Sequence, residues 1–341
     1  MKKRNIWTTA AIVFILAFLF FFLFPGIARI GKEPPFIVRV RILHNAEEPT
    51  ITKGNGSVIV NGREYRGDAE VIKKDSGFDV INRVELEDYL KGVLPREVHY
   101  LWPFGVLKAQ AIASRSFAVY QALSRKNREY DLTADASSQV YGGKDSERWR
   151  TTKAVEATRG RVLEYKGKAF PAYFHSCCGG RTEDASRLWN EDLKPLKGVK
   201  CYWCRWSPRF RWMTRIPTKE ILKKLKSKNY DIKRIDDIRA GKRDPSGRLE
   251  YVSVKSGGKW LEIKTSKFRS AIGRKTLRSA NFRVKKYPFF YLFSGHGWGH
   301  GVGMCQWGAF GLSLRWWSPE RILAHYYPGT KIVRLSEVTG K

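Results

Sequence analysis

One glutamate and two cations stand close together in the sequence, in a pattern suited to acid–base chemistry. Glu97 lies in the segment VLPREV, among apolar residues that can raise the pKa of a carboxyl group. Such a group can act as a general acid at neutral pH. Lys108 and Arg115 follow seven residues apart, so on a helix they share one face and could hold an acidic or polyhydroxyl substrate. A surface glutamate and a solvated basic stripe are the plainer alternatives.

A second candidate is the stretch SGHGWGHGVGMCQWGAFG, residues 294–311. His296 and His300 are four residues apart, a spacing at which a helix would present both side chains to a metal. Glycines recur throughout the stretch, and a helix tolerates so many of them poorly. The pattern favours an extended backbone that another group approaches closely, with His296, His300 and Gln306 forming hydrogen bonds to a substrate. A glycine-rich turn with core histidines is the alternative.

The five cysteines suggest a metal site or disulfides. A C-x-x-C pair occupies residues 201–204, and two cysteines and a histidine lie upstream. Four soft ligands of this kind would suit a structural zinc ion. The predicted ligands are His175, Cys178, Cys201 and Cys204. Disulfides are an equal alternative if the chain is exported, and the odd number leaves at least one thiol free, metal-bound or paired with another chain.

The N-terminal segment indicates export. A basic tip of Lys2, Lys3 and Arg4 precedes an uncharged apolar run over residues 6–24. The length of this run lies between a long signal-peptide core and a short membrane span, and the basic tip keeps its end in the cytoplasm. We therefore expect residues 1–28 to form a single-pass anchor in the cell membrane, with a cleaved signal as the alternative. The rest of the chain would lie on the outer side.

The net charge of the chain limits the classes of partner that we expect. Lys and Arg number 64 and Asp and Glu 32, a formal net charge of +32 over 341 residues. Such an excess implies a polyanionic partner or setting, which could be nucleic acid, an anionic membrane face or the bacterial cell wall. Since an exported chain rarely meets nucleic acid, we expect no nucleic-acid partner.

Strands and helices alternate along the chain. Residues 37–43 alternate apolar and charged side chains, and GSVIVNGREYRG predicts a hairpin with an Asn-Gly turn. Four apolar residues at helical spacing predict a helix: Leu86, Tyr89, Leu90 and Val93. Pro95 should end this helix, so that Glu97 lies in a short break before the next helix. Ser318 and Pro319 mark the start of the last helix.

The predicted fold class is therefore α+β. We expect an N-terminal membrane anchor followed by one large mixed domain of interleaved helices and antiparallel sheets, with a substrate groove. The domain would span residues 29–335 and include a basic sub-lobe at about residues 214–290.

Several segments together resemble the stage II sporulation protein D family, which includes the amidase-enhancer proteins of the cell wall. They run from about residue 37 to residue 330 and include YRGDAEV, INRVELEDYLKGVLPREV, WPFGVLKAQAIASRSFAVY, SSQVYGG, AYFHSCCGGRTEDASRLW, GHGWGHGVGMCQWGAFG and ILAHYYPGT. The resemblance implies a lytic transglycosylase, which cuts peptidoglycan between N-acetylmuramic acid and N-acetylglucosamine and leaves 1,6-anhydro ends. It places Glu97 at the catalytic position, and Lys108 and Arg115 at functionally important basic positions.

The resemblance also implies partners and limits cofactors. The substrate would be glycan strands whose stem peptides a cell-wall amidase has removed, and Ser138 and Gln139 of SSQVYGG would help to line the groove. The reaction needs no cofactor. Some family members bind a metal near the segment that here reads DLTADASSQVY, but this segment has no Cys or His, so a zinc ion would be structural. A non-catalytic glycan-binding activator of an amidase is the alternative function, and either could serve sporulation or general wall remodelling.

Overall fold

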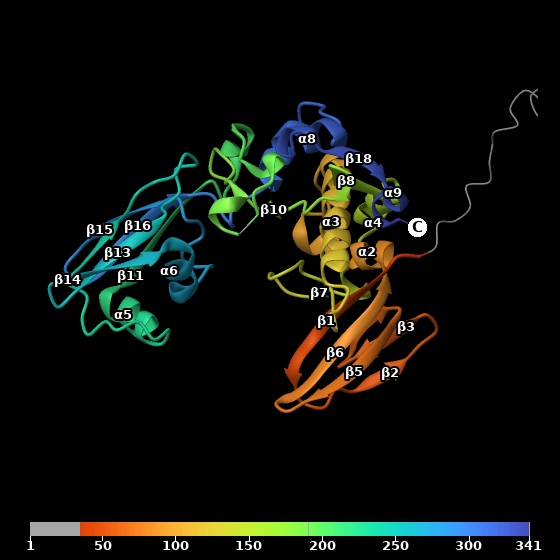
Figure 1. The fold of residues 1–341 in the computed structure, drawn as a ribbon, viewed down its shortest axis with the longest axis horizontal. Helices are drawn as coiled ribbons and strands as arrows, with labels where there is room; N and C mark the ends of the chain where they lie inside the picture. Colours follow the sequence, from red (N-terminus) through yellow and green to blue (C-terminus); the bar gives the residue numbers. More distant parts are fainter. Residues whose placement is uncertain (1–34, 190, 341) are drawn as a thin grey trace, which may run out of the picture. The chain divides into compact units, whose positions relative to one another are not determined.

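The computed structural model describes residues 35–189 and 191–340, which form an α+β fold (Figure 1). The predicted anchor, residues 1–28, lies outside the described residues. Across the described ranges, none of the helices combines the length and apolar character that a membrane crossing needs.

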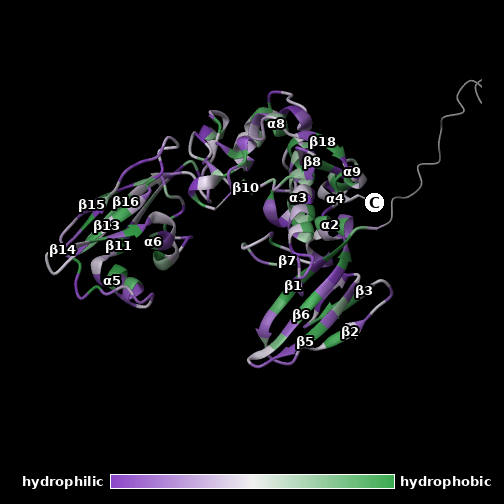
Figure 2. Ribbon diagram, in the orientation of Figure 1, coloured by the Kyte–Doolittle hydropathy of each residue, from purple (hydrophilic) through white to green (hydrophobic). Residues whose placement is uncertain are grey.

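The described residues begin with β1, a strand of a four-stranded sheet in the order β5-β6-β1-β7. Its strands are β1 (Ile37–Ala46), β5 (Asp68–Lys74), β6 (Gly77–Glu85) and β7 (Leu132–Thr133). The pairs β1–β6 and β5–β6 are antiparallel, whereas β7 runs parallel to β1. Hydrophobic and hydrophilic residues alternate along these strands (Figure 2), as expected for a sheet with one face toward the core.

A small antiparallel sheet is inserted between β1 and β5. Its strands are β2 (Ile51–Lys53), β3 (Ser57–Val60) and β4 (Arg63–Arg66). The turn between β3 and β4 is made by Asn61 and Gly62, both at positive φ, as the Asn-Gly pair predicts. The predicted hairpin is therefore confirmed.

A central helix, α3 (Phe104–Ser124), organises the first hydrophobic core. It contacts α2 (Leu86–Glu97), α4 (Trp149–Glu156), α8 (Pro319–Tyr326) and strand β8 (Arg161–Tyr165) (Figure 1). The predicted apolar face of α2 is buried, but the prediction that Pro95 ends this helix is wrong, because α2 continues to Glu97. Burial of that face outweighs the one amide hydrogen bond that a proline removes near the end of a helix.

Two further small sheets lie in the part of the fold that contains α3. One sheet joins β18 (Lys331–Arg334), β8 (Arg161–Tyr165) and β9 (Lys168–Ala169), and the other joins β10 (Phe174–His175) in parallel with β17 (Met304–Cys305). Helix α7 (Gln306–Ser313) follows β17 directly, and α9 (Leu335–Thr339) follows β18. Single-turn helices are η1 (Lys144–Ser146), η2 (Ala185–Arg187), η3 (Lys194–Leu196) and η4 (Trp203–Trp206). The predicted cap of α8 is present, since the Ser318 hydroxyl accepts a hydrogen bond from the Arg321 amide.

Residues 211–296 build a second hydrophobic core between two three-stranded sheets and two helices. One sheet contains β11 (Arg211–Pro217), β16 (Phe290–His296) and β15 (Phe282–Lys286), and the other contains β12 (Asp237–Ala240), β13 (Tyr251–Ser256) and β14 (Lys259–Lys264). The helices are α5 (Thr218–Lys226) and α6 (Thr265–Ile272). All strand pairs here are antiparallel.

Candidate active site

Glu97 is the last residue of α2, and its carboxylate accepts a hydrogen bond from the backbone amide of Val140. The Oε1–N distance is 2.8 Å. The Glu97 side chain is half-buried, and its sequence neighbours Val93, Leu94 and Val98 are buried. Burial raises the pKa of Glu97 from 4.5 to about 7, although the Val140 amide acts in the opposite direction. A carboxyl group that titrates near neutral pH is suited to giving up a proton and taking it back.

The segment that follows Val140 holds it beside Glu97. The amide of Gly142 donates to the carbonyl oxygen of Gly92 at 3.1 Å. A Cβ atom placed on Gly92 would lie 2.5 Å from the ring of Tyr141, so this ring packs directly on the helix backbone. Because Gly92 and Glu97 belong to the same helix, these contacts fix the Val140 amide relative to the Glu97 carboxylate.

A chain of buried polar side chains runs from α2 through α3 to the start of α7. The Tyr89 hydroxyl donates to Gln139 at 3.2 Å, and the Gln139 amide donates to the Ser114 carbonyl at 3.3 Å. The Gln110 amide donates to the Ser114 hydroxyl at 3.1 Å, and the Gln306 amide donates to Gln110 at 3.4 Å. All five residues are buried. Gln139 and Gln306 therefore hold the protein together, and the prediction that they bind substrate is corrected.

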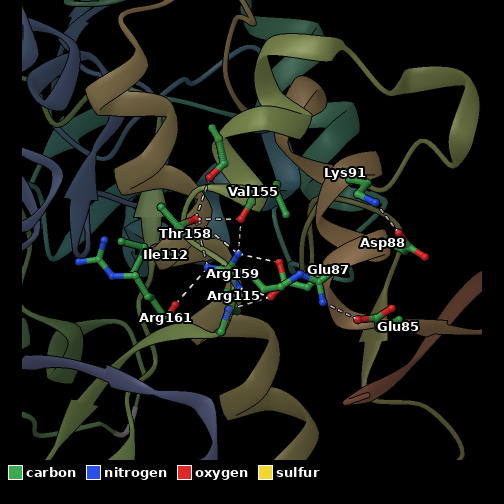
Figure 3. Close-up of polar contacts among 12 residues, drawn as sticks. Glu85, Glu87, Asp88, Lys91, Ile112, Arg115, Val155, Thr158, Arg159 and Arg161 are labelled. Atoms are coloured by element: carbon green, nitrogen blue, oxygen red, sulfur yellow. Dashed lines mark hydrogen bonds and ion pairs between the residues drawn. The ribbon is translucent and has the colours of Figure 1, made fainter. Parts of the chain in front are cut away.

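Arg115 does not face a groove, contrary to the prediction. Its side chain has no exposed surface, and its guanidinium donates to both carboxylate oxygens of Glu87 at 2.8 Å each. It also donates to the carbonyl oxygens of Val155 and Arg161 (Figure 3). Helix α3 is buried on almost every side, so this position meets the core and not solvent. Arg115 joins α3 to α2, α4 and β8.

Lys108 and Ser138 are only partly buried. The Lys108 ammonium lies 4.9 Å from the centre of the Phe104 ring, and within residues 35–189 and 191–340 no carboxylate lies within ion-pair distance of it. The Ser138 hydroxyl accepts a hydrogen bond from the Thr133 amide at 3.1 Å. Contact of either side chain with a substrate stays a prediction.

The glycines of the stretch 294–311 pack against the protein itself. Gly297, Gly299, Gly301 and Gly303 all have positive φ, so residues 297–303, between β16 and β17, form a loop and not an extended strand. A Cβ atom on Gly297 would lie 2.7 Å from the Cys177 carbonyl oxygen, and one on Gly299 would lie 2.9 Å from the Cβ of His175. The close approach that the glycines indicate is therefore made by residues of this chain, which corrects the expectation that a substrate approaches this backbone.

His300 has no ring nitrogen free for a substrate. Its Nε2 is 2.9 Å from the carbonyl oxygen of Phe174, and its Nδ1 accepts a hydrogen bond from the Val302 amide at 3.0 Å. This pair of contacts requires a neutral ring that carries its proton on Nε2. Burial favours the same state by lowering the pKa of His300 to about 4. His300 is thus a partly buried histidine held by the backbone of this chain, which corrects its assignment to hydrogen bonding with a substrate.

Comparisons with known proteins assign the segment around Glu97 to a family. Residues 74–165, which include Glu97, Arg115 and Val140, match the model of a family described as Stage II sporulation protein. The chain is similar to Stage II sporulation protein D of Bacillus amyloliquefaciens, with 31% identity over 294 residues, 79% of this chain and 83% of that protein. The chain belongs to the stage II sporulation protein D family.

Two further relatives and a second domain match extend the comparison. An uncharacterised protein of Brachyspira hyodysenteriae is 34% identical over 282 residues, covering 82% of this chain and 75% of that protein. The amidase enhancer of Bacillus subtilis is 31% identical over 290 residues, and the match spans 71% of this chain but 40% of the enhancer. Residues 198–303 match a domain of unknown function. The second core thus coincides with a segment separate from the family match around Glu97.

His296 is exposed and lines a cavity of about 710 Å³ on the second core. The cavity is basic, since its lining also includes Arg211, Arg243 and Arg283. Burial and these guanidinium groups lower the pKa of His296. Neither Glu97 nor Val140 lines this cavity. We nevertheless place the candidate acid–base chemistry at Glu97, because its carboxyl group has a raised pKa and accepts a hydrogen bond from the Val140 amide. Binding of a substrate by His296 stays a prediction.

All five cysteines are buried, free thiols, so the disulfide alternative is not realised. Four of their Sγ atoms lie within 4.8 Å of one another and could hold a structural metal. These atoms belong to Cys178, Cys201, Cys204 and Cys305. His175 lies outside the group and has its Nδ1 3.0 Å from the carbonyl oxygen of Val302. Cys305 thus takes the place that the sequence assigned to His175, because the pairing of β17 with β10 brings it there.

Proposed function

We propose that this chain is a lytic transglycosylase of cell-wall remodelling, with Glu97 as its catalytic acid and base. The observation that carries the proposal is a single half-buried glutamate at the end of α2, with a pKa near 7 and an amide donor at 2.8 Å. The names of its relatives, which refer to sporulation and to an amidase enhancer, support a role in cell-wall remodelling.

The reaction requires one proton to leave Glu97 and another to return to it. The protonated carboxyl group donates to the oxygen of the glycosidic bond, and the bond between this oxygen and the anomeric carbon of the muramic sugar breaks. The 6-hydroxyl oxygen of the same sugar bonds to that carbon, and Glu97 takes the hydroxyl proton. General acid–base help of this kind contributes roughly 10²–10⁴-fold to the rate.

A single carboxyl group is sufficient for this reaction. Hydrolytic glycosidases use a pair of carboxyl groups, because a second group must attack the sugar or activate water. No charged side chain among the described residues contributes to the pKa shift of Glu97, as a carboxylate held close to it would. The hydrogen bond from Val140 can steady the carboxylate that forms after proton donation.

The charge and the N-terminal segment support a proposed location and substrate for the reaction. A net charge of +32 suits an enzyme that works against the anionic bacterial wall. We propose that residues 1–28 anchor the chain in the cell membrane, that the domain lies on the outer side, and that its substrate is glycan stripped of stem peptides by an amidase. Lys108, Ser138 and His296 are the remaining candidates for contacts with the glycan.

Digestion of purified, peptide-stripped glycan strands tests this function. Mass spectrometry should find fragments with 1,6-anhydro ends for the wild-type protein and for Glu156→Gln, and none for Glu97→Gln. Glu156 is a matched control because it is also the last residue of a helix but is exposed. Full activity of Glu97→Gln, or water-added ends in place of anhydro ends, would refute the proposal.

The relative named amidase enhancer supports a second candidate, a non-catalytic activator that holds glycan for an amidase. A purified cell-wall amidase, assayed on intact peptidoglycan with and without this protein, distinguishes the two. Stimulation that survives Glu97→Gln, together with an absence of anhydro ends, would favour the activator.

A further inference from the structure

The four clustered thiols have the spacing of ligands around one metal ion. The side chains of Cys178, Cys201, Cys204 and Cys305 are buried, with at most 1% exposure. A tetrahedral zinc ion has bonds of about 2.3 Å to sulfur, which puts neighbouring sulfur atoms about 3.8 Å apart. The Cys178 and Cys204 Sγ atoms are 3.5 Å apart, and all four fall within 4.8 Å of one another. These separations are close to those expected for four sulfur ligands around one ion.

Hydrogen-bond donors surround these sulfur atoms. The amides of Cys178 and Gly308 lie 3.2 and 3.3 Å from the Cys305 Sγ. The Gly180 amide is 3.4 Å from the Cys178 Sγ, and the Tyr326 hydroxyl is 3.1 Å from the Cys201 Sγ. Donors of this kind stabilise thiolates and orient the ligands of metal sites. The surroundings are therefore suited to thiolates more than to an inert apolar cluster.

A buried cation, Arg248, lies next to the cluster. The Arg248 guanidinium has almost no exposed surface and donates to the Cys178 carbonyl oxygen at 2.8 Å. The guanidinium also donates to the Ser246 hydroxyl, which in turn donates to the Glu183 carboxylate, and this carboxylate is near enough for Arg248 to lower its pKa. Burial of a cation is costly unless negative charge lies nearby. Four thiolates around a doubly charged ion carry a net charge of −2 and would add to the negative charge that Glu183 supplies.

The backbone at Gly308 leaves room for the cysteine cluster. A Cβ atom on Gly308 would lie 2.5 Å from the Cys201 Sγ and would also collide with the Tyr326 hydroxyl. The absence of a side chain at Gly308 lets the first turn of α7 approach Cys201. The cluster thereby brings together the residues after β10, the single turn η4 and the start of α7.

We propose that Cys178, Cys201, Cys204 and Cys305 bind one Zn²⁺ as a structural clasp. Binding converts four thiols to thiolates, so one Zn²⁺ enters and four protons leave. The clasp fixes Cys305 at the beginning of α7, and the next residue, Gln306, begins the buried polar chain that reaches Gln139 beside Val140. Zinc therefore supports the position of the Glu97 site from a distance and takes no part in the reaction.

Metal analysis of the purified full-length protein in detergent tests the clasp without reference to activity. Elemental analysis should find one zinc ion per chain. Cys305→Ala should lose it, whereas Cys177→Ala and His175→Ala should keep it. Cys177 is the matched control, because it is an equally buried neighbour of Cys178 outside the group of four. Zinc that stays in Cys305→Ala but is lost from His175→Ala would overturn the ligand set.

Two measurements on the wild-type protein keep the proposal testable if Cys305→Ala does not fold. After denaturation with a chelator and without reductant, all five cysteines should titrate as thiols. Cobalt substituted for zinc should give the visible absorption of a tetrahedral, four-thiolate site. Fewer than five thiols, no bound zinc, or iron with inorganic sulfide would each overturn the proposal, since soft thiolate sites can also hold iron–sulfur clusters.

Discussion

Arg115 and Glu87 form a bidentate ion pair inside the protein, with both N–O distances at 2.8 Å and both side chains buried. Removal of the guanidinium in Arg115→Ala would leave the Glu87 carboxylate buried without its partner. Breaking a buried pair in this way costs about 3–5 kcal/mol. We expect a loss of this size in the free energy of unfolding, measured by urea denaturation, and little change for Lys108→Ala.

The double variant Glu87→Leu with Arg115→Met separates this explanation from a direct role in binding. Because replacing both partners by apolar groups is often neutral, the double variant should be more stable than Arg115→Ala alone. If Arg115→Ala instead unfolds like the wild-type protein and yet loses activity, Arg115 belongs to the substrate site after all.

The pKa of Glu97, raised by burial to about 7, predicts how the rate depends on pH. Only the protonated carboxyl group can donate to the leaving oxygen, and its population falls as the pH rises through 7. Above that value kcat/KM should fall about tenfold per pH unit. Initial rates on soluble, peptide-stripped glycan between pH 5 and pH 9 would measure this. A rate that stays level to pH 9 would show that Glu97 is not the acid.

The same shift predicts a gain in stability for Glu97→Gln at high pH. The folded pKa lies above the ordinary value of 4.5, so the wild-type protein is stabilised below pH 4.5 and loses this stability as the pH rises through 7. At about 1.4 kcal/mol per pKa unit, the loss is at most about 3.5 kcal/mol. Because glutamine does not titrate, the stability of Glu97→Gln relative to the wild-type protein should rise by up to this amount from pH 4 to pH 8. Parallel urea curves at both pH values check it, and an equal difference at both would contradict the raised pKa.

Local features of the sequence predicted the local structure well. The Asn61–Gly62 turn and the start of α8 at Ser318 and Pro319 depend on the conformational preferences of a few adjacent residues. The prediction that α2 ends at Pro95 was wrong because the end of this helix is determined by its packing against other elements. The apolar neighbours of Glu97 indicated a setting that could raise its pKa, as burial does, but only the resemblance to the family singled it out as the catalytic residue.

The incorrect site predictions share one physical cause. Whether Arg115 or His300 faces a substrate depends on which distant segments cover it, and neither helical spacing nor glycine content contains that information. The sequence did not predict the roles of the Val140 amide and the Gly92 backbone, because residue type does not show which backbone groups will lie near Glu97. Cys305 was one of two cysteines, with Cys177, that the sequence left unassigned.

Gly92 offers a test of how the Glu97 site is held together. In an exposed helix interior, Gly→Ala stabilises by about 1 kcal/mol. Here the added Cβ would lie 2.5 Å from the Tyr141 ring and 2.9 Å from the Gly143 carbonyl oxygen, so the segment carrying Val140 must shift. A displacement of about 1 Å at a reacting group can lower a rate by about 100-fold. We expect Gly92→Ala to lose a large part of kcat on soluble glycan while Lys91→Ala, one residue away, keeps it. A Gly92→Ala protein with raised thermal stability and unchanged kcat would show that the packing of Tyr141 on α2 does not position Glu97.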